Sequence, residues 1–242
     1  MGESYDLVGV GTGFASSFFL HEYLAHAPSD ARVLVLEKGR RLPYAWKLEN
    51  GRTSDVRFDR LIENATPEKQ WVQNVAFGGG ACWTGNTPRF LPSDFRLGSE
   101  FGIGDDWPIG YEELEPYYQR VEAQMGIAGE AGGPYPRSAP YPCPAHPTNA
   151  LDRLLAEKYP GQLVPMPSAR SSSSARTQRT RCCADGICSL CPIASKFQVD
   201  LHFSRVFEDP RVELLTEASV ERVDISGDSV VGAFYEREGR EH

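Results

Sequence analysis

The sequence predicts an α/β fold in which a parallel sheet near the N-terminus is followed, toward the C-terminus, by an antiparallel meander. Two apolar runs, Tyr5–Val10 and Val33–Leu36, have the length and composition of strands buried on both faces. A helix-length stretch rich in Phe, Leu and Ala, Phe14–Leu24, separates them and completes a βαβ unit. The meander is predicted from three short strand-like segments, Val212–Thr216, Ser219–Ile225 and Val230–Tyr235.

The sequence between these two ends is less regular. Helical spacing predicts helices over Tyr111–Met125 and Asn149–Lys158. Pro43–Asn74 is polar and irregular, so few elements are expected there. Gly126–Pro147 is rich in proline and glycine, which indicates an irregular connection or lid. Ser168–Arg181 is a Ser/Arg stretch of low complexity, and we expect it to run over the surface.

Composition excludes several classes of protein. The chain has 242 residues, 40% of them apolar, which is enough to build a core and excludes disorder throughout the chain. Its net charge of −8 makes nucleic acid an unfavourable partner. No apolar run reaches the roughly 18 residues that a membrane span needs, and Met1–Ser4 shows no basic leader. We therefore expect a cytoplasmic protein without a membrane span, with export in complex with a signal-bearing partner as the alternative.

A glycine motif lies between the first predicted strand and helix. In the register Gly11-Thr12-Gly13-Phe14-Ala15-Ser16, two glycines permit a tight turn and a close approach to a pyrophosphate, and the small Ser16 takes the packing position. The alternative register, starting at Gly9, puts the bulky Phe14 at that position. We therefore expect the backbone around Gly11, Gly13 and Ser16 to bind a pyrophosphate at the helix N-terminus.

An acidic residue, Glu37, ends the second predicted strand. At this place a carboxylate accepts hydrogen bonds from the ribose hydroxyls of an adenine nucleotide, and it repels a 2′-phosphate. Strand, glycine motif, helix, strand and acid occur in the order that the motif requires. The sequence therefore predicts a Rossmann-like fold of the FAD/NAD(P)-binding type.

Three further segments resemble the glucose-methanol-choline (GMC) family of FAD-dependent oxidoreductases. The stretch Phe77–Arg89 is similar to the family's Gly-Gly segment along the flavin, and its Trp-Thr-x-x-Thr-Pro portion is closest to pyranose oxidase. Trp107-Pro108-Ile109, with the helix that follows it, resembles the start of the family's substrate region. Cys182–Lys196 resembles the cysteine-rich segment of FAD-dependent glucose and gluconate dehydrogenase subunits.

This resemblance implies FAD as the cofactor and assigns residues to it. Gly78, Gly79, Thr84 and Asn86 would lie along the isoalloxazine ring, and the backbone of Val220 would pair with the adenine. Cys82 stands where pyranose oxidase has a histidine bound covalently to the flavin, so no histidyl link is expected. For Cys82 a buried thiol is favoured over a cysteinyl link.

A cluster of cysteines lies in the segment that resembles the dehydrogenase subunits, and thiolates are ligands for zinc and iron–sulfur clusters. The resemblance implies a three-iron four-sulfur cluster. The adjacent pair at its start disfavours a structural zinc, because neighbouring side chains do not easily converge on one tetrahedron. The iron–sulfur cluster is therefore favoured over zinc and over thiols without metal, and the candidate ligands are Cys182, Cys183, Cys188 and Cys191.

The resemblance also implies a reaction, the oxidation of CH–OH groups of alcohols or sugars with hydride transfer to flavin N5. In the family that the sequence resembles, the catalytic pair, His–His or His–Asn, lies in a C-terminal half, which we expect to be absent from this sequence. None of the five histidines matches that pair, so no catalytic residue is assigned: His21, His26, His146, His202 and His242.

We therefore expect a fragment, or one piece of a split protein. Its expected division is an FAD-binding part over 1–90, a substrate-side insertion with the cysteine loop over 91–200, and a return to the FAD-binding domain over 201–242. The strands near Val230 are expected to leave an unpaired edge and uncovered apolar surface. The expected partners are an electron-acceptor subunit or the missing half. The alternatives are a non-catalytic nucleotide-binding remnant and an iron–sulfur electron-transfer subunit.

Overall fold

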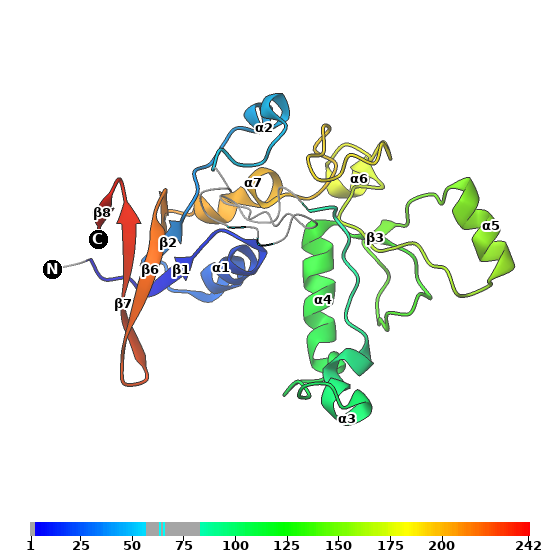
Figure 1. The fold of residues 1–242 in the computed structure, drawn as a ribbon, viewed down its shortest axis with the longest axis horizontal. Helices are drawn as coiled ribbons and strands as arrows, with labels where there is room; N and C mark the ends of the chain where they lie inside the picture. The colour runs from blue at the N-terminus through cyan, green and yellow to red at the C-terminus, as the bar shows by residue number, and fades with distance from the viewer. Residues whose placement is uncertain (1–2, 57–62, 64, 66–82) are drawn as a thin grey trace. The chain divides into compact units, whose positions relative to one another are not determined.

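The computed structural model of the chain describes residues 3–56, 63, 65 and 83–242. The chain forms two compact units, one made of Met1–Trp83 with Gln198–His242, and the other of Thr84–Phe197 (Figure 1). Within the described ranges, no helix combines the length and the apolar character needed to cross a membrane.

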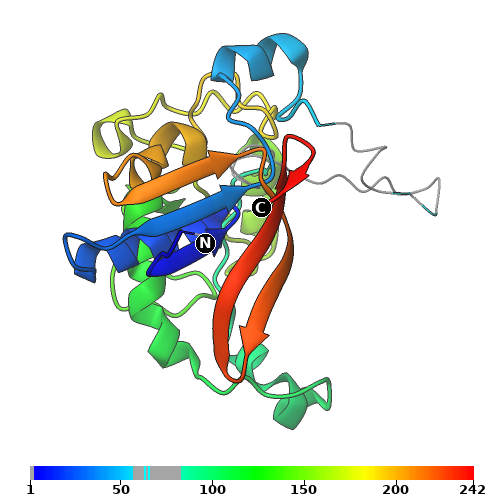
Figure 2. The ribbon, with the colours of Figure 1, turned by 90° about the vertical axis from the view of Figure 1, so that its left-hand side faces the viewer.

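The first unit contains the parallel sheet that the sequence predicts. Its strands are β1 (Leu7–Val10), β2 (Val33–Glu37) and β5 (Val212–Thr216), in the order β1-β2-β5. Both pairings are parallel, with Leu7 opposite Val33 and Val33 opposite Val212. Helix α1 (Phe14–His26) connects β1 to β2, and the three strands lie side by side in Figure 2. The predicted βαβ unit is therefore confirmed.

Burial differs between the first two strands. Every residue of β2 is buried, as expected for a central parallel strand. In β1, however, alternate residues are exposed, with Val8 at 40% and Val10 at 54%. The expectation that β1 is buried on both faces was wrong, because among the described residues no element covers the face of β1 that carries Val8 and Val10.

An antiparallel meander is present in the first unit, but the prediction that Val212–Thr216 belongs to it was wrong, because this segment pairs parallel with β2 as strand β5 of the parallel sheet. The meander consists of β6 (Ser219–Ser226), β7 (Ser229–Arg237) and the short β8 (Arg240–Glu241), all antiparallel. The base of the hairpin packs on a core cluster around Leu34 and Leu36. Its tip is open to solvent, with Ile225 69% and Val230 68% exposed, so the expected uncovered apolar surface near Val230 is confirmed.

A buried ion pair joins two short helices of the first unit that the sequence analysis did not anticipate. Lys47 lies on α2 (Tyr44–Asn50) and Asp200 on α7 (Val199–His202), and their charged groups are hydrogen-bonded to each other. Both side chains are almost completely buried. After α7 the chain continues into the short 3-10 helix η4 (Ser204–Phe207). Part of the segment predicted to be irregular is therefore an anchored helix.

The second unit is mainly helical. Helix α4 (Tyr111–Met125) has the bounds that the sequence predicts and ends at Gly126, whose φ is 61°. Helix α5 begins at Ala150, with Asn149 as its N-cap, and ends at Lys158. The remaining elements are the 3-10 helix η3 (Pro92–Arg96), α3 (Leu97–Phe101), β3 (Ala128–Gly129), β4 (Cys143–Pro144) and α6 (Ser174–Thr177).

A buried network of charges holds the proline-rich segment on α4. Arg89 donates from Nε and Nη2 to both carboxylate oxygens of Glu122, at 2.8 and 2.9 Å. Its Nη1 donates to Glu115 Oε1 at 3.1 Å and to the carbonyl of Pro136 at 3.0 Å. Arg137, in the proline-rich segment, also donates to Glu122, at 2.9 Å. The predicted irregular connection is therefore fixed by side-chain charges.

The Ser/Arg stretch is partly buried, so the expectation of a surface segment was wrong for its first half. Ser168, Ala169 and Ser171 have no exposed area, since this backbone is hydrogen-bonded within the unit. The guanidinium of Arg179 is buried as well and donates to the carbonyls of Ala169 at 2.8 Å and Met125 at 2.6 Å. Burial lowers the pKa of Arg179 to about 10. A polar composition therefore did not indicate exposure here.

Candidate functional site

The glycine loop between β1 and α1 has the backbone conformation that its glycines allow. Gly11 has a φ of 83°, in the left-handed region that favours glycine. Its N–H donates to the carbonyl of Leu36 at 2.7 Å, which fixes the turn against β2. Gly13 is the N-cap of α1 in an extended conformation. A Cβ on either glycine would meet no atom of the described residues within 4 Å.

The N-terminus of α1 has the properties of an anion site. No side chain caps it, and its first turn carries no acidic residue. The N–H groups of the first turn, which no intrahelical acceptor can satisfy, are the groups that bind phosphate in dinucleotide-binding folds. Ser16 lies in this turn, and its hydroxyl donates to the carbonyl of Val10 at 3.4 Å. The predicted pyrophosphate residues Gly11, Gly13 and Ser16 are thus adjacent at one helix end.

Glu37 is directed at this loop. Its Oε2 accepts hydrogen bonds from the backbone N–H of Thr12 at 2.9 Å and from the Thr12 hydroxyl at 2.6 Å. Its Oε1 accepts from the N–H of Gly39 at 2.8 Å. The carboxylate is therefore oriented by three donors at the carboxyl end of β2, next to the loop between β1 and α1. Thr12 was not singled out from the sequence, although a hydroxyl between two glycines is a visible signal.

Val220 lies on β6, which begins beside Glu37. The N–H of Ala218 donates to the carbonyl of Glu37 at 2.9 Å, and that of Glu217 donates to the carbonyl of Gly39 at 3.1 Å. Val220 is opposite Tyr235 in the meander and packs on the core cluster around Leu36. Two segments far apart in the sequence, which carry the residues predicted for ribose and adenine, are therefore neighbours in the first unit.

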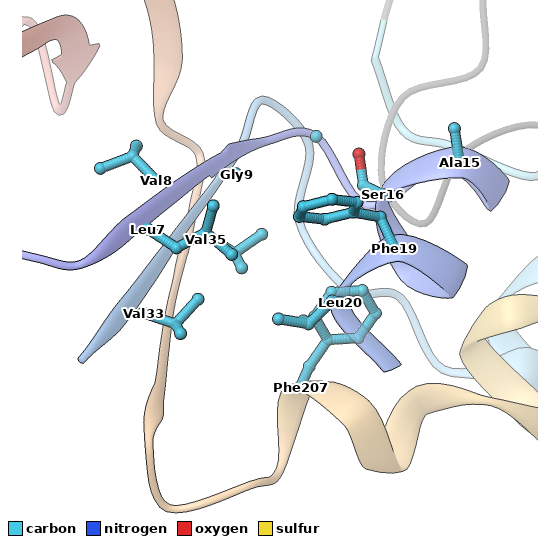
Figure 3. Close-up of a pocket in the computed structure, with 11 residues that line it drawn as sticks. Leu7, Val8, Gly9, Ala15, Ser16, Phe19, Leu20, Val33, Val35 and Phe207 are labelled. Atoms are coloured by element: carbon cyan, nitrogen blue, oxygen red, sulfur yellow. The ribbon is translucent and has the colours of Figure 1, made fainter. Parts of the chain in front are cut away.

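An apolar pocket of about 360 Å³ lies beside the glycine loop, between the sheet and α1. Figure 3 shows Leu7, Val33 and Val35 on the strands, with Phe19 and Leu20 on the helix. The hydroxyl of Ser16 is the one side-chain polar group among its lining residues. Such a lining suits an apolar group and does not suit a diphosphate. The apolar lining of this pocket therefore differs from the polar N–H groups of the predicted phosphate site.

The residues predicted for the flavin ring fall in two groups. Gly78 and Gly79 lie outside the described residues, as does Cys82. Thr84 and Asn86 belong to the second unit, and both side chains are exposed. Asn86 forms an isolated bridge with Ser168, and its Oδ1 accepts from Arg170 Nη2 at 3.4 Å. Arg170 is a further contact residue that the sequence did not indicate.

The four thiols of the cysteine loop are not gathered around a common point. Cys191 is buried and Cys183 is exposed, whereas Cys182 and Cys188 are half-buried. Cys188 Sγ is 3.5 Å from Arg170 Nη1, which places a cation at this thiol. Within the described part of the chain, no three His, Cys, Asp or Glu side chains are arranged to hold a metal ion. The geometry of these residues does not fit a cluster, and the iron–sulfur prediction is not supported.

We compared the chain with known proteins by sequence and by structure. No family model matches the chain. It is 29% identical to the large subunit of fructose dehydrogenase from Gluconobacter japonicus, over 80% of this chain and 42% of the relative. It is 45% identical to 2-methyl-1,2-propanediol dehydrogenase from Mycolicibacterium austroafricanum, over 27% of this chain and 12% of the relative.

A solved structure extends the similarity to the whole chain. Pyridoxine 4-oxidase from Mesorbium loti matches 99% of this chain and 47% of its own length, with a TM-score of 0.59 and 20% identity, which shows a shared fold. The chain spans less than half the length of each of these proteins. Over most of its length the chain is similar to these dehydrogenases and oxidases, which are FAD-dependent oxidoreductases of the glucose-methanol-choline type, as the resemblance in the sequence predicted.

Proposed function

We propose that the chain is the FAD-binding portion of an oxidoreductase that acts on CH–OH groups of alcohols or sugars. The observation that carries the proposal is the orientation of Glu37 toward the glycine loop, because dinucleotide-binding folds combine a glycine loop with an acid at the end of the following strand. The names of the relatives support the substrate class, since fructose and 2-methyl-1,2-propanediol both carry hydroxyl groups.

Each predicted residue has a role in this proposal. The backbone N–H groups around Gly11, Gly13 and Ser16 bind the pyrophosphate, aided by the positive end of the α1 dipole. Glu37 accepts from the ribose hydroxyls and excludes a 2′-phosphate, and the backbone of Val220 pairs with the adenine. Thr84 and Asn86, together with Gly78 and Gly79, line the isoalloxazine side.

When bound, FAD supplies the chemistry of a hydride acceptor for the carbon that bears the hydroxyl. The residues of this chain bind and orient the cofactor, and we assign none of them as the base that takes the hydroxyl proton. The proposal therefore includes a further polypeptide. It is either the part that corresponds to the unmatched length of the relatives or a partner subunit, as the name "large subunit" implies for the fructose dehydrogenase relative.

Calorimetric titration of the chain with FAD, ADP and NADP⁺ tests the binding step. FAD and ADP are expected to bind, whereas NADP⁺ is not, because its 2′-phosphate meets the Glu37 carboxylate. Dye reduction by added sugars and alcohols then tests activity. No heat on addition of FAD to folded protein would refute the proposal. Binding of FAD without dye reduction, even after the proposed further polypeptide is supplied, would favour the non-catalytic remnant.

A further inference from the structure

Arg170 connects two segments of the second unit that the sequence analysis treated separately. Its Nη2 donates to Asn86 Oδ1 at 3.4 Å, in the stretch predicted to contact the flavin. Its Nη1 is 3.5 Å from Cys188 Sγ, in the cysteine loop. One guanidinium therefore contacts both the predicted flavin side and the loop in which a metal cluster was expected.

The backbone around this arginine is paired on both sides. The N–H of Ala169 donates to the carbonyl of Gly85 at 2.7 Å, and the N–H of Phe197 donates to the carbonyl of Ala169 at 2.9 Å. Arg170 itself forms an antiparallel bridge with Lys196. The residue is thus held between the flavin-side stretch and the segment that follows the cysteine loop, and its backbone cannot shift without breaking these contacts.

The side chain of Arg170 also packs closely on Gly85. A Cβ at position 85 would lie 3.3 Å from the Cγ atoms of both Arg170 and Lys196, which is closer than side chains normally approach. Gly85 also has a φ of 85°, in the left-handed region. Both this conformation and the lack of space for a Cβ favour glycine at position 85. The absence of a side chain at Gly85 leaves room for the arginine to reach Asn86.

Within the part of the chain that the structure describes, no acid neutralises the charge of Arg170. Among the described residues, no carboxylate forms an ion pair with it, and its Nε is buried without a hydrogen-bond partner. The neighbouring His146 contacts the carbonyl of Arg170 through Nε2 at 3.1 Å. Burial is the main cause that lowers the pKa of His146, and the charge of Arg170 contributes to it. The guanidinium is therefore held by an amide oxygen and a thiol, and its position depends on both.

We propose that Arg170 is a positioning residue that fixes the side chain of Asn86 and transmits changes at the Cys188 thiol to the flavin side of the site. The inference rests on the proposed function, because Asn86 matters to the flavin only if FAD binds. It gives the cysteine loop a role that needs no metal: Cys188 holds one end of the guanidinium, and Asn86 holds the other.

The first test uses double-mutant cycles in the chain without FAD. Arg170→Met is combined with Asn86→Ala and, separately, with Cys188→Ala, and unfolding is followed in urea. Each pair is expected to be coupled by about threefold in the unfolding constant, the size of one modest hydrogen bond. Arg181→Met with Cys183→Ala is the control pair, because both side chains are exposed, and it should be additive. Additive effects in the two Arg170 pairs would overturn the inference.

The second test uses the FAD-loaded protein and a spectroscopic readout. Arg170→Met is expected to weaken FAD binding by about threefold to tenfold and to shift the visible flavin absorption, whereas Arg170→Lys restores part of both. Cys188→Ala should shift the absorption in the same direction, and Cys183→Ala should not. An unchanged flavin spectrum in Arg170→Met would overturn the inference.

The two tests separate this inference from the proposed function. If the wild-type chain binds no FAD, the proposed function fails, and the flavin end of the inference fails with it. The coupling cycles then still decide whether Arg170 joins Asn86 to Cys188. If wild-type FAD binding is normal and the variants behave like the wild type, only the inference fails.

Discussion

The two units fix their irregular segments by different means. In the first unit, the glycine loop is held by main-chain geometry: a positive φ at Gly11, an N–H donated to Leu36, and an uncapped helix N-terminus. In the second unit, arginine side chains hold the loops, with Arg89 on the proline-rich segment and Arg179 on buried carbonyls. A loop built on main-chain geometry can be predicted from local sequence, whereas a loop held by guanidinium groups cannot.

The largest expected effect is on the charge network of the second unit. Arg89→Met removes the cation that both Glu122 oxygens contact and leaves a buried carboxylate partly uncompensated. Loss of one partner of a buried ion pair costs about 3–5 kcal/mol, although Arg137 still contacts Glu122 and limits the loss. Urea unfolding measures the change, and Arg153→Met, an exposed arginine of α5, is the control. Equal stabilities of the two variants would contradict the role given to the network.

The second effect tests the glycine loop of the first unit. Gly11→Val forces a β-branched residue to a φ of 83°, at a cost of about 1–3 kcal/mol of strain, and the loop is expected to relax away from its binding conformation. FAD binding should weaken by at least about tenfold, measured by calorimetry. Gly132→Val is the matched control, with a φ of 88° in an exposed loop of the second unit. It should lose stability without losing FAD affinity, and equal losses of affinity would break the comparison.

The contrast between the units also explains which structural features could be predicted from the sequence. The order of strand, glycine, helix, strand and acid predicts the geometry around Gly11 and Glu37, because each step follows from local sterics and periodicity. The pairs Lys47–Asp200 and Arg89–Glu122 were missed, since a charged residue far from its partner in sequence resembles any solvated residue. Long-range pairing of charges leaves no periodic signal.

Composition misled in two places for a related physical reason. The Ser/Arg stretch was expected at the surface, yet Ser168 and Ser171 are buried, because backbone hydrogen bonds to neighbouring segments satisfy much of the polarity of this stretch. The cysteine spacing indicated a metal, yet Cys188 contacts Arg170. In both cases the residue type limits the interactions that a side chain can form, and its neighbours in the folded structure determine which of them it forms.

A smaller effect is expected from acid. Burial raises the pKa of Glu115, but hydrogen bonds from Gln119, Ser138 and Arg89 outweigh it and lower this pKa to about 2. Because the folded pKa is below the unfolded value of about 4.3, the stabilisation is complete above that value and is lost as the pH falls toward about 2.

Glu115→Gln should therefore flatten the acid limb of the stability curve between about pH 4.5 and 2.5. Urea unfolding at several pH values measures it, with Glu100→Gln on α3 as the exposed control. A wild-type slope retained in Glu115→Gln would show that other carboxylates dominate acid unfolding.

The smallest expected effect concerns metal at the cysteine loop. Because the thiols of Cys182, Cys183, Cys188 and Cys191 are not gathered around one point, a chelator should leave the thermal midpoint and the visible absorption of the protein unchanged. Anaerobic reconstitution with ferrous iron and sulfide is the stricter version, with Cys191→Ser as the matched variant. A broad visible band that appears in the wild type, disappears in Cys191→Ser and bleaches on reduction would restore the iron–sulfur assignment.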